Sequence, residues 1–247
     1  CEFISPLVFE TLTGNKCYVD TFDRNFKFDV EHISLAKKAD IFMIAPATAN
    51  VIAKIANGIA DDMLTTTFLA SKCKKIVSPA MNTAMFENQI TQENIAKLKK
   101  YGIGVIEPQN GILACGDTGA GKMPEPDFLF DVIEREIARE KDMLGKKVLV
   151  TAGATMESLD PVRFLTNHSS GKMGFAIAKE AMLRGAEVTV VKANTTAAIP
   201  NFVKIVEVSS AKDMFDAVTA LSDQQDIIVK AAAVADYTPE SYVDSKI

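Results

Sequence analysis

Short apolar runs alternate with amphipathic stretches along most of this chain, and this alternation constrains the fold more than any other feature. Each apolar run has the length of a buried strand, and each amphipathic stretch has the spacing of a helix that packs on one face. Strand–helix–strand units of this kind imply parallel sheets with ligand sites at the carboxyl ends of the strands. The sequence therefore predicts an α/β protein.

In the first half of the chain, three strands and three helical stretches are expected. The strands are predicted at 40–46, 75–80 and 104–107, and the helices at 49–71, 91–101 and 127–139. Gly58 interrupts the first of these helices. Residues 111–126 are rich in glycine and show no periodicity, so we expect a loop, whose length favours a functional loop or lid.

A polar, charged segment at 140–147 is the best linker candidate, and the alternation restarts after it. The second half is expected to contain strands at 147–151, 187–191, 202–208 and 226–234, helices at 174–184 and 211–221, and a long loop at 152–172. A chain of 247 residues is comfortable for two domains. We therefore predict two Rossmann-like parallel-sheet domains, residues 1–143 and 144–247, with the seam close to Gly145.

Charge and cysteine content exclude several classes of protein. A net charge of −5 gives no electrostatic case for binding nucleic acid or an anionic membrane, although local basic groups can still bind small anionic substrates. No apolar run reaches the ~20 residues that span a bilayer, and no secretory signal is visible. The four cysteines match no zinc motif and no dense disulfide framework, which favours a reducing, cytoplasmic location. They are Cys1, Cys17, Cys73 and Cys115.

Two predicted strand ends in the first half carry small and polar residues. In Pro46–Asn50, small residues would let a flat ligand approach the backbone, and Thr48 and Asn50 can hydrogen-bond it. The alternative is a plain turn in which Thr or Asn caps the next helix. The segment Pro79–Asn82 ends the next strand, where the Asn82 amide can hold a carboxylate or a carbonyl.

Groups that can transfer protons also stand out in the first half. The segment Ala114–Met123 has three glycines within six residues, which predicts a mobile loop with Cys115 near its start and Lys122 near its end. A reactive thiol needs exposure and a polar setting, and this loop offers both; the alternative is a glycine-rich turn with an incidental cysteine. His32 could move protons at neutral pH, or could be a surface or helix-cap histidine.

The second half offers a candidate anion site. After the strand that ends at Thr151–Gly153, the segment Asn167–Gly174 opens a helix with serine hydroxyls, backbone N–H groups and the helix dipole. It is neither a Walker A nor a GxGxxG pattern, and the alternative is a simple Ser/Thr cap. Asp236 could accept from a ribose hydroxyl or lie near a metal, while Lys246 by itself would count as a solvated lysine.

The order and spacing of these stretches resemble the bifunctional phosphopantothenoylcysteine decarboxylase / phosphopantothenate–cysteine ligase family of bacterial coenzyme A biosynthesis. The resemblance covers essentially the whole chain. The motifs that carry it are FISPL (3–7), HISLA (32–36), APATAN (45–50), PAMNTAM (79–85), ACGDTGAGKM (114–123), TAGATMESLDPVRFLTNHSSGKMG (151–174) and AAAVADY (231–237).

For the first domain, the resemblance implies a flavin-dependent decarboxylase. His32 would be the active-site histidine, Asn82 would hold the substrate's cysteine carboxylate, and Cys115 would donate a proton from a clamp over the substrate. The cysteine side chain would be oxidised to a thioaldehyde, carbon dioxide would leave, and the enethiol would be protonated and reduced to 4′-phosphopantetheine. The implied FMN contacts are Phe3, Ser5, Ala45, Pro46, Thr48, Asn50 and Met85. The implied substrate contacts are Asn82, Met85, Gly116, Asp117, Lys122 and Met123.

For the second domain, the resemblance implies a ligase that activates 4′-phosphopantothenate with CTP and Mg²⁺. A phosphopantothenoyl-cytidylate would form, and the cysteine amine would displace CMP. Asn167 would act in the acyl-cytidylate step with the substrate contact Arg163 nearby, and Lys246 would be the first lysine of a K-x-K-K motif. No metal ligands are assigned. The implied nucleotide contacts are Gly153, Ser169, Ser170, Gly171, Lys172, Ala231, Ala232, Asp236 and Lys246.

The resemblance also implies features beyond one chain. The family's decarboxylase starts about 35–40 residues earlier, with a Gly/Ser loop suited to the FMN phosphate, and its ligase continues past Ile247. Decarboxylase domains would form trimers, which often assemble into dodecamers, with FMN near a subunit interface, and ligase domains would dimerise.

Two other functions stay open on the sequence. One is a flavin decarboxylase that acts on peptide C-terminal cysteines, fused to an unrelated nucleotide-binding module; the match at Thr151–Gly174 argues against it. The other is a regulatory flavoprotein that binds phosphatase-type partners. Such proteins usually lack part of the set of catalytic residues, whereas His32, Asn82 and Cys115 are all present here.

Overall fold

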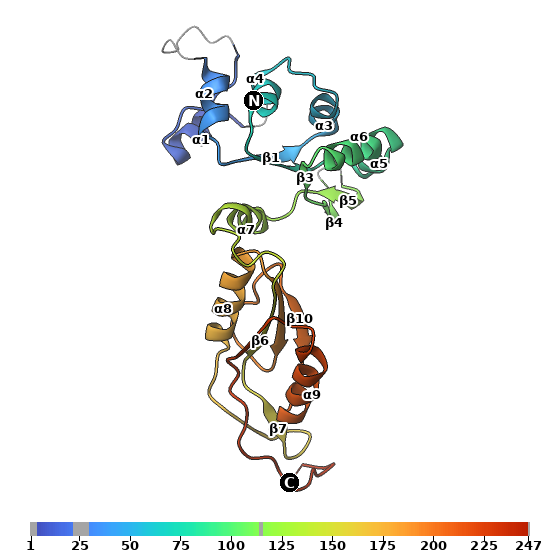
Figure 1. Cartoon of the computed structure of the whole chain (residues 1–247). Helices are drawn as coiled ribbons and strands as arrows, with labels where there is room; N and C mark the ends of the chain where they lie inside the picture. The colour runs from blue at the N-terminus through green and yellow to red at the C-terminus, as the bar shows by residue number, and fades with distance from the viewer. Residues whose placement is uncertain (1–3, 22–29, 114–115, 247) are drawn as a thin grey trace. The chain divides into compact units, whose positions relative to one another are not determined.

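The computed structural model describes residues 4–21, 30–113 and 116–246, and the chain folds into two compact units (Figure 1). The N-terminal unit comprises Cys1–Pro126 and the C-terminal unit Asp127–Ile247. Parallel sheets with helices packed on them occur in both units, so the predicted α/β class is confirmed. In the described ranges, no helix is long and apolar enough to cross a membrane.

The N-terminal unit is built around a parallel sheet in the order β1-β2-β3. The strands are β1 (Ile41–Ala47), β2 (Lys74–Pro79) and β3 (Gly104–Val105). Ile44 of β1 lies in register with Val77 of β2. Both side chains are buried in one core with Ile52 of α3 (Ala49–Ala56) and Leu98 of α6 (Gln89–Lys100).

The predicted helix at 49–71 is interrupted near Gly58, as expected. Gly58 adopts a left-handed conformation (φ 70°) after α3, and Asp62 then starts α4 (Met63–Ala70) with a capping box to Thr65. The remaining helices of this unit are α1 (Pro6–Thr13), α2 (Glu31–Lys38) and α5 (Thr83–Glu87).

Two segments that we expected to be loops contain antiparallel hairpins instead. Residues 111–126 include the end of β4 (Gln109–Ile112) and all of β5 (Thr118–Lys122), and residues 152–172 include β7 (Met156–Ser158) and β8 (Phe164–Thr166). These strands are three to five residues long, which is too short to display a period of two. Their pairing comes from register across the hairpin, which the sequence pattern does not reveal.

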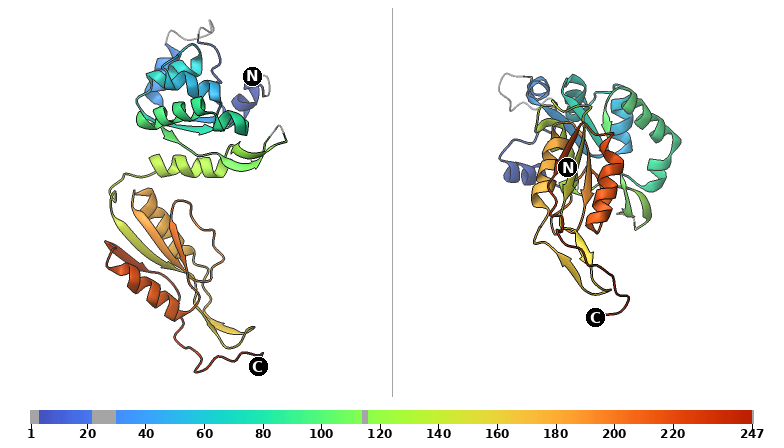
Figure 2. Two further views of the ribbon diagram at one scale, coloured as in Figure 1. Left: turned by 90° about the vertical axis from the view of Figure 1, so that its right-hand side faces the viewer. Right: turned by 60° about the horizontal axis from the view of Figure 1, so that its bottom comes forward.

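The C-terminal unit contains a parallel sheet in the order β10-β9-β6-β11. Its strands are β6 (Lys147–Ala152), β9 (Glu187–Lys192), β10 (Lys204–Glu207) and β11 (Ile227–Lys230). The helices α8 (Lys172–Leu183) and α9 (Ala211–Ser222) lie on opposite sides of this sheet (Figure 2). After β6 the chain adds β9 and then β10 on one side of β6, and it later adds β11 on the other side of β6. This is the doubly wound order, with a switch point between β6 and β11.

Residues of β6 alternate between the two faces of the sheet. Val148 and Val150 pack with Phe175 of α8, whereas Leu149 packs with Met214 of α9. Because both faces are covered, the strand is a continuous apolar run, and for this reason its position could be predicted from the sequence.

Helix α7 (Pro126–Ile137) packs within the C-terminal unit. Phe128 and Arg135 lie on the ring of Phe202, at 5.4 Å between ring centroids and 4.9 Å from guanidinium to ring. The boundary between the two packed units therefore lies after Pro126. The boundary predicted from the sequence lies between residues 143 and 144. Within the polar segment at 140–147, residues 142–145 form a turn that is tied to the end of α8, because Met143 N–H donates to Arg184 O at 3.0 Å.

Candidate active sites

The carboxyl ends of β1 and β2 meet at one edge of the N-terminal sheet. Ala80 N–H donates to Ala47 O at 3.0 Å, which joins the two turns singled out in the sequence. Ala45, Pro46 and Asn50 are exposed there. Thr48 is the N-cap of α3, with Oγ1 accepting from Val51 N–H at 3.3 Å, so the capping interpretation is correct for its hydroxyl.

Asn82 has two roles at the end of β2. Its Oδ1 accepts from Ala84 N–H at 2.9 Å and caps α5. Its Nδ2 donates to Asp117 Oδ2 at 3.4 Å, a long contact with the hairpin β4–β5. The cap uses the carbonyl oxygen of the amide, so the NH₂ group is the end directed to the hairpin.

The β4–β5 hairpin is docked on the turn that follows β2. Met81 N–H donates to Gly121 O at 3.1 Å. A Cβ at Gly121 would lie 2.1 Å from Met81 O, and a Cβ at Gly119 would lie 2.4 Å from Thr83 Oγ1. The glycines of this segment thus permit close backbone approach, and the prediction that they make a mobile loop is wrong for β5.

Other expected clamp residues surround this contact. Gly116 is exposed with φ 88°, and Leu113 N–H donates to Asp117 O at 2.8 Å. Lys122 Nζ lies 2.8 Å from Glu125 Oε1, and this hydrogen bond lowers the pKa of Glu125. Met123 is half-buried. Cys115, the expected proton donor, and Phe3, an expected FMN contact, lie outside the described residues.

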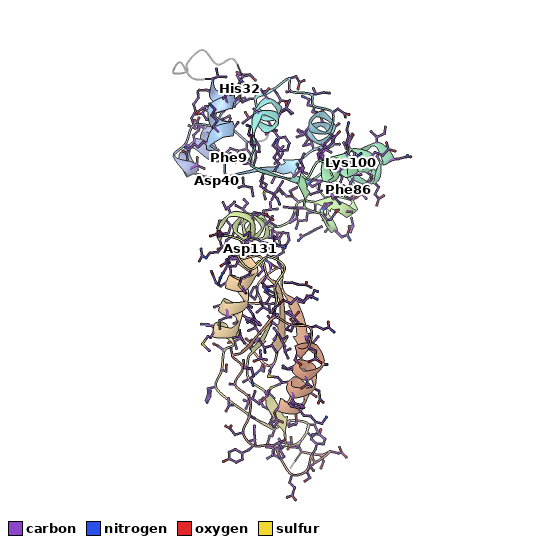
Figure 3. The ribbon with its side chains drawn as sticks, in the orientation of Figure 1. Phe9, His32, Asp40, Phe86, Lys100 and Asp131 are labelled. Carbon is purple, nitrogen blue, oxygen red and sulfur yellow. The ribbon has the colours of Figure 1, made fainter. Side chains whose placement is uncertain are left out.

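The remaining expected residues of this unit lie on α1, α2 and α5. Ser5 caps α1, with Oγ accepting from Leu7 N–H at 3.3 Å, and Met85 on α5 is half-exposed. His32 is half-buried on α2. Figure 3 shows His32 well apart from Phe86 of α5, the helix that Asn82 caps. His32 on α2 therefore lies apart from Phe86 on α5 in one copy of the chain (Figure 3).

In the C-terminal unit, three glycines shape the switch point at the end of β6. A Cβ at Gly153 would lie 2.4 Å from Asn194 O, and one at Gly171 would lie 2.5 Å from Thr195 Oγ1. A Cβ at Gly174 would lie 2.7 Å from Ala152 Cβ, so this glycine lets α8 approach β6 closely. These three glycines allow a tight turn, an open backbone and close helix–strand packing. Glycines serve the same three functions in dinucleotide-binding loops.

The loop before α8 presents backbone N–H groups and two serine hydroxyls. Ser169 Oγ accepts from Gly171 N–H at 3.4 Å, and Ser170 Oγ from Lys172 N–H at 3.5 Å. Thr195 Oγ1 donates to Ser170 O at 2.6 Å and fixes the loop from the end of β9. The N-cap of α8 is Gly171, without a side-chain cap, and the two serine hydrogen bonds are long, which leaves this helix N-terminus well suited to a stronger acceptor such as a phosphate.

Buried threonines that the sequence analysis missed hold the end of β11. Thr151 Oγ1 accepts from the N–H groups of Ala231 and Ala232, both at 3.1 Å. Thr155 Oγ1 accepts from Ala235 N–H at 2.9 Å. A signal for them exists in the sequence, because both threonines lie at or just after the end of a predicted buried strand, at the edge where ligands bind.

Asn167 and Arg163 lie on the β7–β8 side of this site. Asn167 Nδ2 donates to Val234 O at 3.1 Å, which links the expected acyl-transfer residue to the end of β11. Arg163 is oriented by the buried Asp160, whose Oδ2 accepts from Arg163 Nε at 2.8 Å. Asp160 was not predicted as a residue of this site, although Asp-Pro-x-Arg is typical of an Asx turn.

The last two expected nucleotide contacts are less fixed. Asp236 and Lys246 are both exposed. Lys246 follows Val243, whose N–H donates to Leu159 O at 3.1 Å and anchors the tail. Among the described residues, no group of three or more His, Cys, Asp or Glu side chains could hold a metal ion.

Comparison with known proteins gives matches over both units. The flavoprotein family profile matches residues 1–138, and the profile of the DNA/pantothenate metabolism flavoprotein C-terminal domain matches residues 143–247. The coenzyme A biosynthesis bifunctional protein CoaBC of Bacillus subtilis is 44% identical over 100% of this chain and 62% of its own length. CoaBC of Vibrio vulnificus is 44% identical over 100% of this chain and 61% of its own length. This chain thus spans less than two thirds of these relatives.

Solved structures also match each part. A mutant PPC decarboxylase complexed with pantothenoylaminoethenethiol is 36% identical with a TM-score of 0.46, covering 48% of this chain and 68% of that one. The C-terminal domain of CoaBC is 51% identical with a TM-score of 0.38, covering 40% of this chain and 50% of that one.

The family profile over residues 1–138 covers more than half of the 247 residues. The chain belongs to the flavoprotein family.

Proposed function

We propose that the N-terminal unit decarboxylates phosphopantothenoylcysteine with bound FMN, as a step of coenzyme A biosynthesis. The observation that carries the proposal is the docking of the β4–β5 hairpin on the turn that holds Asn82. This docking forms a polar clamp beside the exposed end of β1. Membership of the flavoprotein family and the relatives named for coenzyme A biosynthesis support the same function.

The end of β1 fits a flat flavin ring. Ala45 and Pro46 are small and exposed, and Asn50 is exposed at the start of α3 with hydrogen-bonding capacity toward the ring edge. Thr48 and Ser5 would contribute from the two helix caps, with Phe3 and Met85 as apolar contacts. FMN, when bound, supplies the two-electron oxidation of the substrate's cysteine side chain that makes loss of carbon dioxide easy.

The residues of the chain orient the substrate and move protons. Asn82 would hold the cysteine carboxylate through Nδ2, since its Oδ1 serves the cap of α5. Asp117, Gly116, Lys122 and Met123 would cover the substrate from the hairpin and exclude water. Cys115 Sγ would donate the proton to carbon in the last step, and His32 would act as the second proton-transfer group. Because His32 lies apart from Phe86 of α5 in one copy (Figure 3), we propose that it acts at an interface between copies of a trimer.

Turnover tests these roles directly. Carbon dioxide release from phosphopantothenoylcysteine is measured with the flavin-loaded full-length protein, and Cys115→Ser and His32→Asn are each expected to abolish it. Full activity in both variants would overturn the assignment. Activity on peptides with a C-terminal cysteine, without activity on phosphopantothenoylcysteine, would instead support the other decarboxylase class.

For the C-terminal unit we propose CTP-dependent ligation of 4′-phosphopantothenate with cysteine. The support is the switch-point loop, in which the open backbone at Gly153 and Gly171 meets the N-terminus of α8. Mg²⁺ would enter with CTP, because Mg²⁺ in nucleotide sites binds largely through phosphates and waters. The phosphates would be bound by Ser169, Ser170 and Lys172, and the nucleoside by Ala231, Ala232 and Asp236.

Asn167 would act in formation or use of the acyl-cytidylate, and Arg163 would bind the substrate's negative charge. Lys246 would approach the triphosphate from the tail.

The test is CTP-dependent pyrophosphate release by the full-length protein. Asn167→Asp should impair it strongly, because a carboxylate would face Val234 O and the anionic substrate. His168→Gln, an exposed neighbour, is the control, and equal activity of the two variants would remove Asn167 from the mechanism.

A further inference from the structure

A cavity of about 440 Å³ lies in the N-terminal unit, and no step of the proposed function uses it. It is bounded by the end of α3, by α4 and by the segment that joins α6 to β3. Its floor is apolar and includes Ile55, Phe68 and Ile103. Its rim is polar and includes Asn57, Lys75 and Lys97. We name it the Lys75 pocket.

The Lys75 pocket opens at the amino edge of the sheet. Lys75 is the second residue of β2, whereas the candidate decarboxylase site begins at Pro79, the last residue of the same strand. Four residues of extended strand span roughly 13 Å. The two sites are therefore separate, with the buried core of the sheet between them.

Local sequence explains how the pocket forms. After α3, Gly58 in its left-handed conformation turns the chain, and Ile59 N–H donates back to Lys54 O at 2.9 Å. This turn makes one wall. The lining also contains the ring of Phe68, which packs edge-on against Phe42 at 5.4 Å between ring centroids.

Among the described residues, the two lysines of the rim have no carboxylate partner. Lys75 Nζ lies 5.0 Å from the centroid of the Phe68 ring, and Lys97 Nζ donates to Asn57 Oδ1 at 2.9 Å. By contrast, Lys99 on the same helix as Lys97 pairs with Glu107 at 2.6 Å. Both rim lysines are half-buried. Burial lowers the pKa of Lys75, which means that its charged form would gain from a nearby anion.

We propose that the Lys75 pocket binds a small ligand that has a flat apolar body and one anionic group. The apolar body would lie on Phe68, Ile55 and Ile103, and the anionic group would meet Lys75 and Lys97. The volume is in the range of small-molecule sites, which combine an apolar lining with a few placed polar groups. Within the described part of the chain, no acidic residue lines the pocket to oppose the anion.

A matched pair of probes separates the anion from the apolar body. Naphthalene-1-acetate and the neutral naphthalene-1-acetamide are titrated by calorimetry into the full-length protein saturated with FMN, so that the flavin site is filled. We expect one saturable site for the acetate and about tenfold weaker binding of the amide, the usual effect of losing one charge-assisted hydrogen bond. Equal affinities, or no saturable binding of the acetate, would overturn the proposal.

Variants locate the site. Lys75→Gln and Lys97→Gln should each weaken the acetate about tenfold and leave the amide unchanged, and Lys75→Arg should keep most of the acetate affinity. Lys99→Gln removes the same charge outside the pocket and should change nothing. Thermal unfolding curves confirm that each variant folds. A loss in Lys99→Gln as large as that in Lys75→Gln, or density for the naphthyl group away from Phe68 in a soaked crystal, would contradict the assignment.

Discussion

The side-chain amide of Asn82 donates to the carboxylate of Asp117 across 3.4 Å, although the two residues are 35 positions apart. One caps α5 at the end of β2, and the other lies just before β5 in the hairpin. Their contact depends on the docking of Gly121 on Met81, because that hydrogen bond sets the register of the hairpin against the turn. The site in the N-terminal unit is thus held together by backbone contacts as much as by its polar side chains.

Replacing Gly121 by Ala should therefore damage the proposed decarboxylase activity. The new Cβ would lie 2.1 Å from Met81 O, and φ of 142° is unfavourable for alanine, so the hairpin must move away from Asn82. We expect carbon dioxide release to fall at least about tenfold, which corresponds to roughly 1.4 kcal/mol.

Gly116→Ala is the matched control for this change. Gly116 also has a positive φ, but no described atom lies within 4 Å of the place that its new Cβ would occupy. It should lose less activity than Gly121→Ala. Equal losses would show that backbone strain alone, and not docking, explains the effect.

Thr151→Val should weaken the proposed nucleotide site. Valine has nearly the shape of threonine but leaves the N–H groups of Ala231 and Ala232 without their acceptor, at a cost of about 1–3 kcal/mol for each unsatisfied group. Protection of β6 amides from hydrogen exchange and the affinity for CTP should both fall. Thr189→Val on β9 is the control and should leave both nearly unchanged; a similar loss there would contradict this role for Thr151.

The stabilising effect of Asp213 should depend on pH. Its carboxylate accepts from Ser210 N–H at 2.9 Å in the capping box of α9, and these hydrogen bonds lower the pKa of Asp213. A lowered pKa means that the stabilisation is present above the unfolded value of about 3.9 and is lost as pH falls through the lower folded value. We expect Asp213→Ala to reduce the free energy of unfolding by about 0.5–1 kcal/mol at pH 7, and the difference to shrink below about pH 4.

Urea unfolding of both proteins between pH 3 and pH 7 measures this difference. Asp223→Ala, at the other end of α9, is the control, since the Asp223 side chain forms no hydrogen bond in the described part of the chain. A difference for Asp213→Ala that is constant with pH would show that the carboxylate charge is not responsible.

The strands β2 and β6 could be predicted well from the sequence because they are mostly buried. The run at 147–151 is apolar on both faces, since α8 covers Val148 and Val150 while α9 covers Leu149. The hairpin β4–β5 was missed for the opposite reason. Its strands are short and rich in glycine, and their position is fixed by contacts with Met81 and Thr83 that are distant in sequence.

In the candidate sites too, some residues could be located from the sequence and others could not. Residues at strand ends, such as Thr48 and Gly153, could be located because parallel strands end at one edge. Thr195 and Asp160 could not be located, since they reach the sites through turns whose geometry depends on tertiary packing. His32 is a different case, because in one copy of the chain it lies on α2, apart from Phe86 of α5 (Figure 3).

The central claim is that the Asn82 amide binds the substrate carboxylate, and a comparison of two cap variants tests it most directly. Asn82→Asp keeps an acceptor for Ala84 N–H but replaces the donor that faces the hairpin, and Asn88→Asp makes the same change at the cap of α6, where Oδ1 accepts from Ile90 N–H at 3.0 Å. Carbon dioxide release from phosphopantothenoylcysteine should fall at least about a hundredfold in kcat/KM for Asn82→Asp, or roughly 2.7 kcal/mol, and stay near the wild-type value for Asn88→Asp. Equal activity of the two variants would contradict the account.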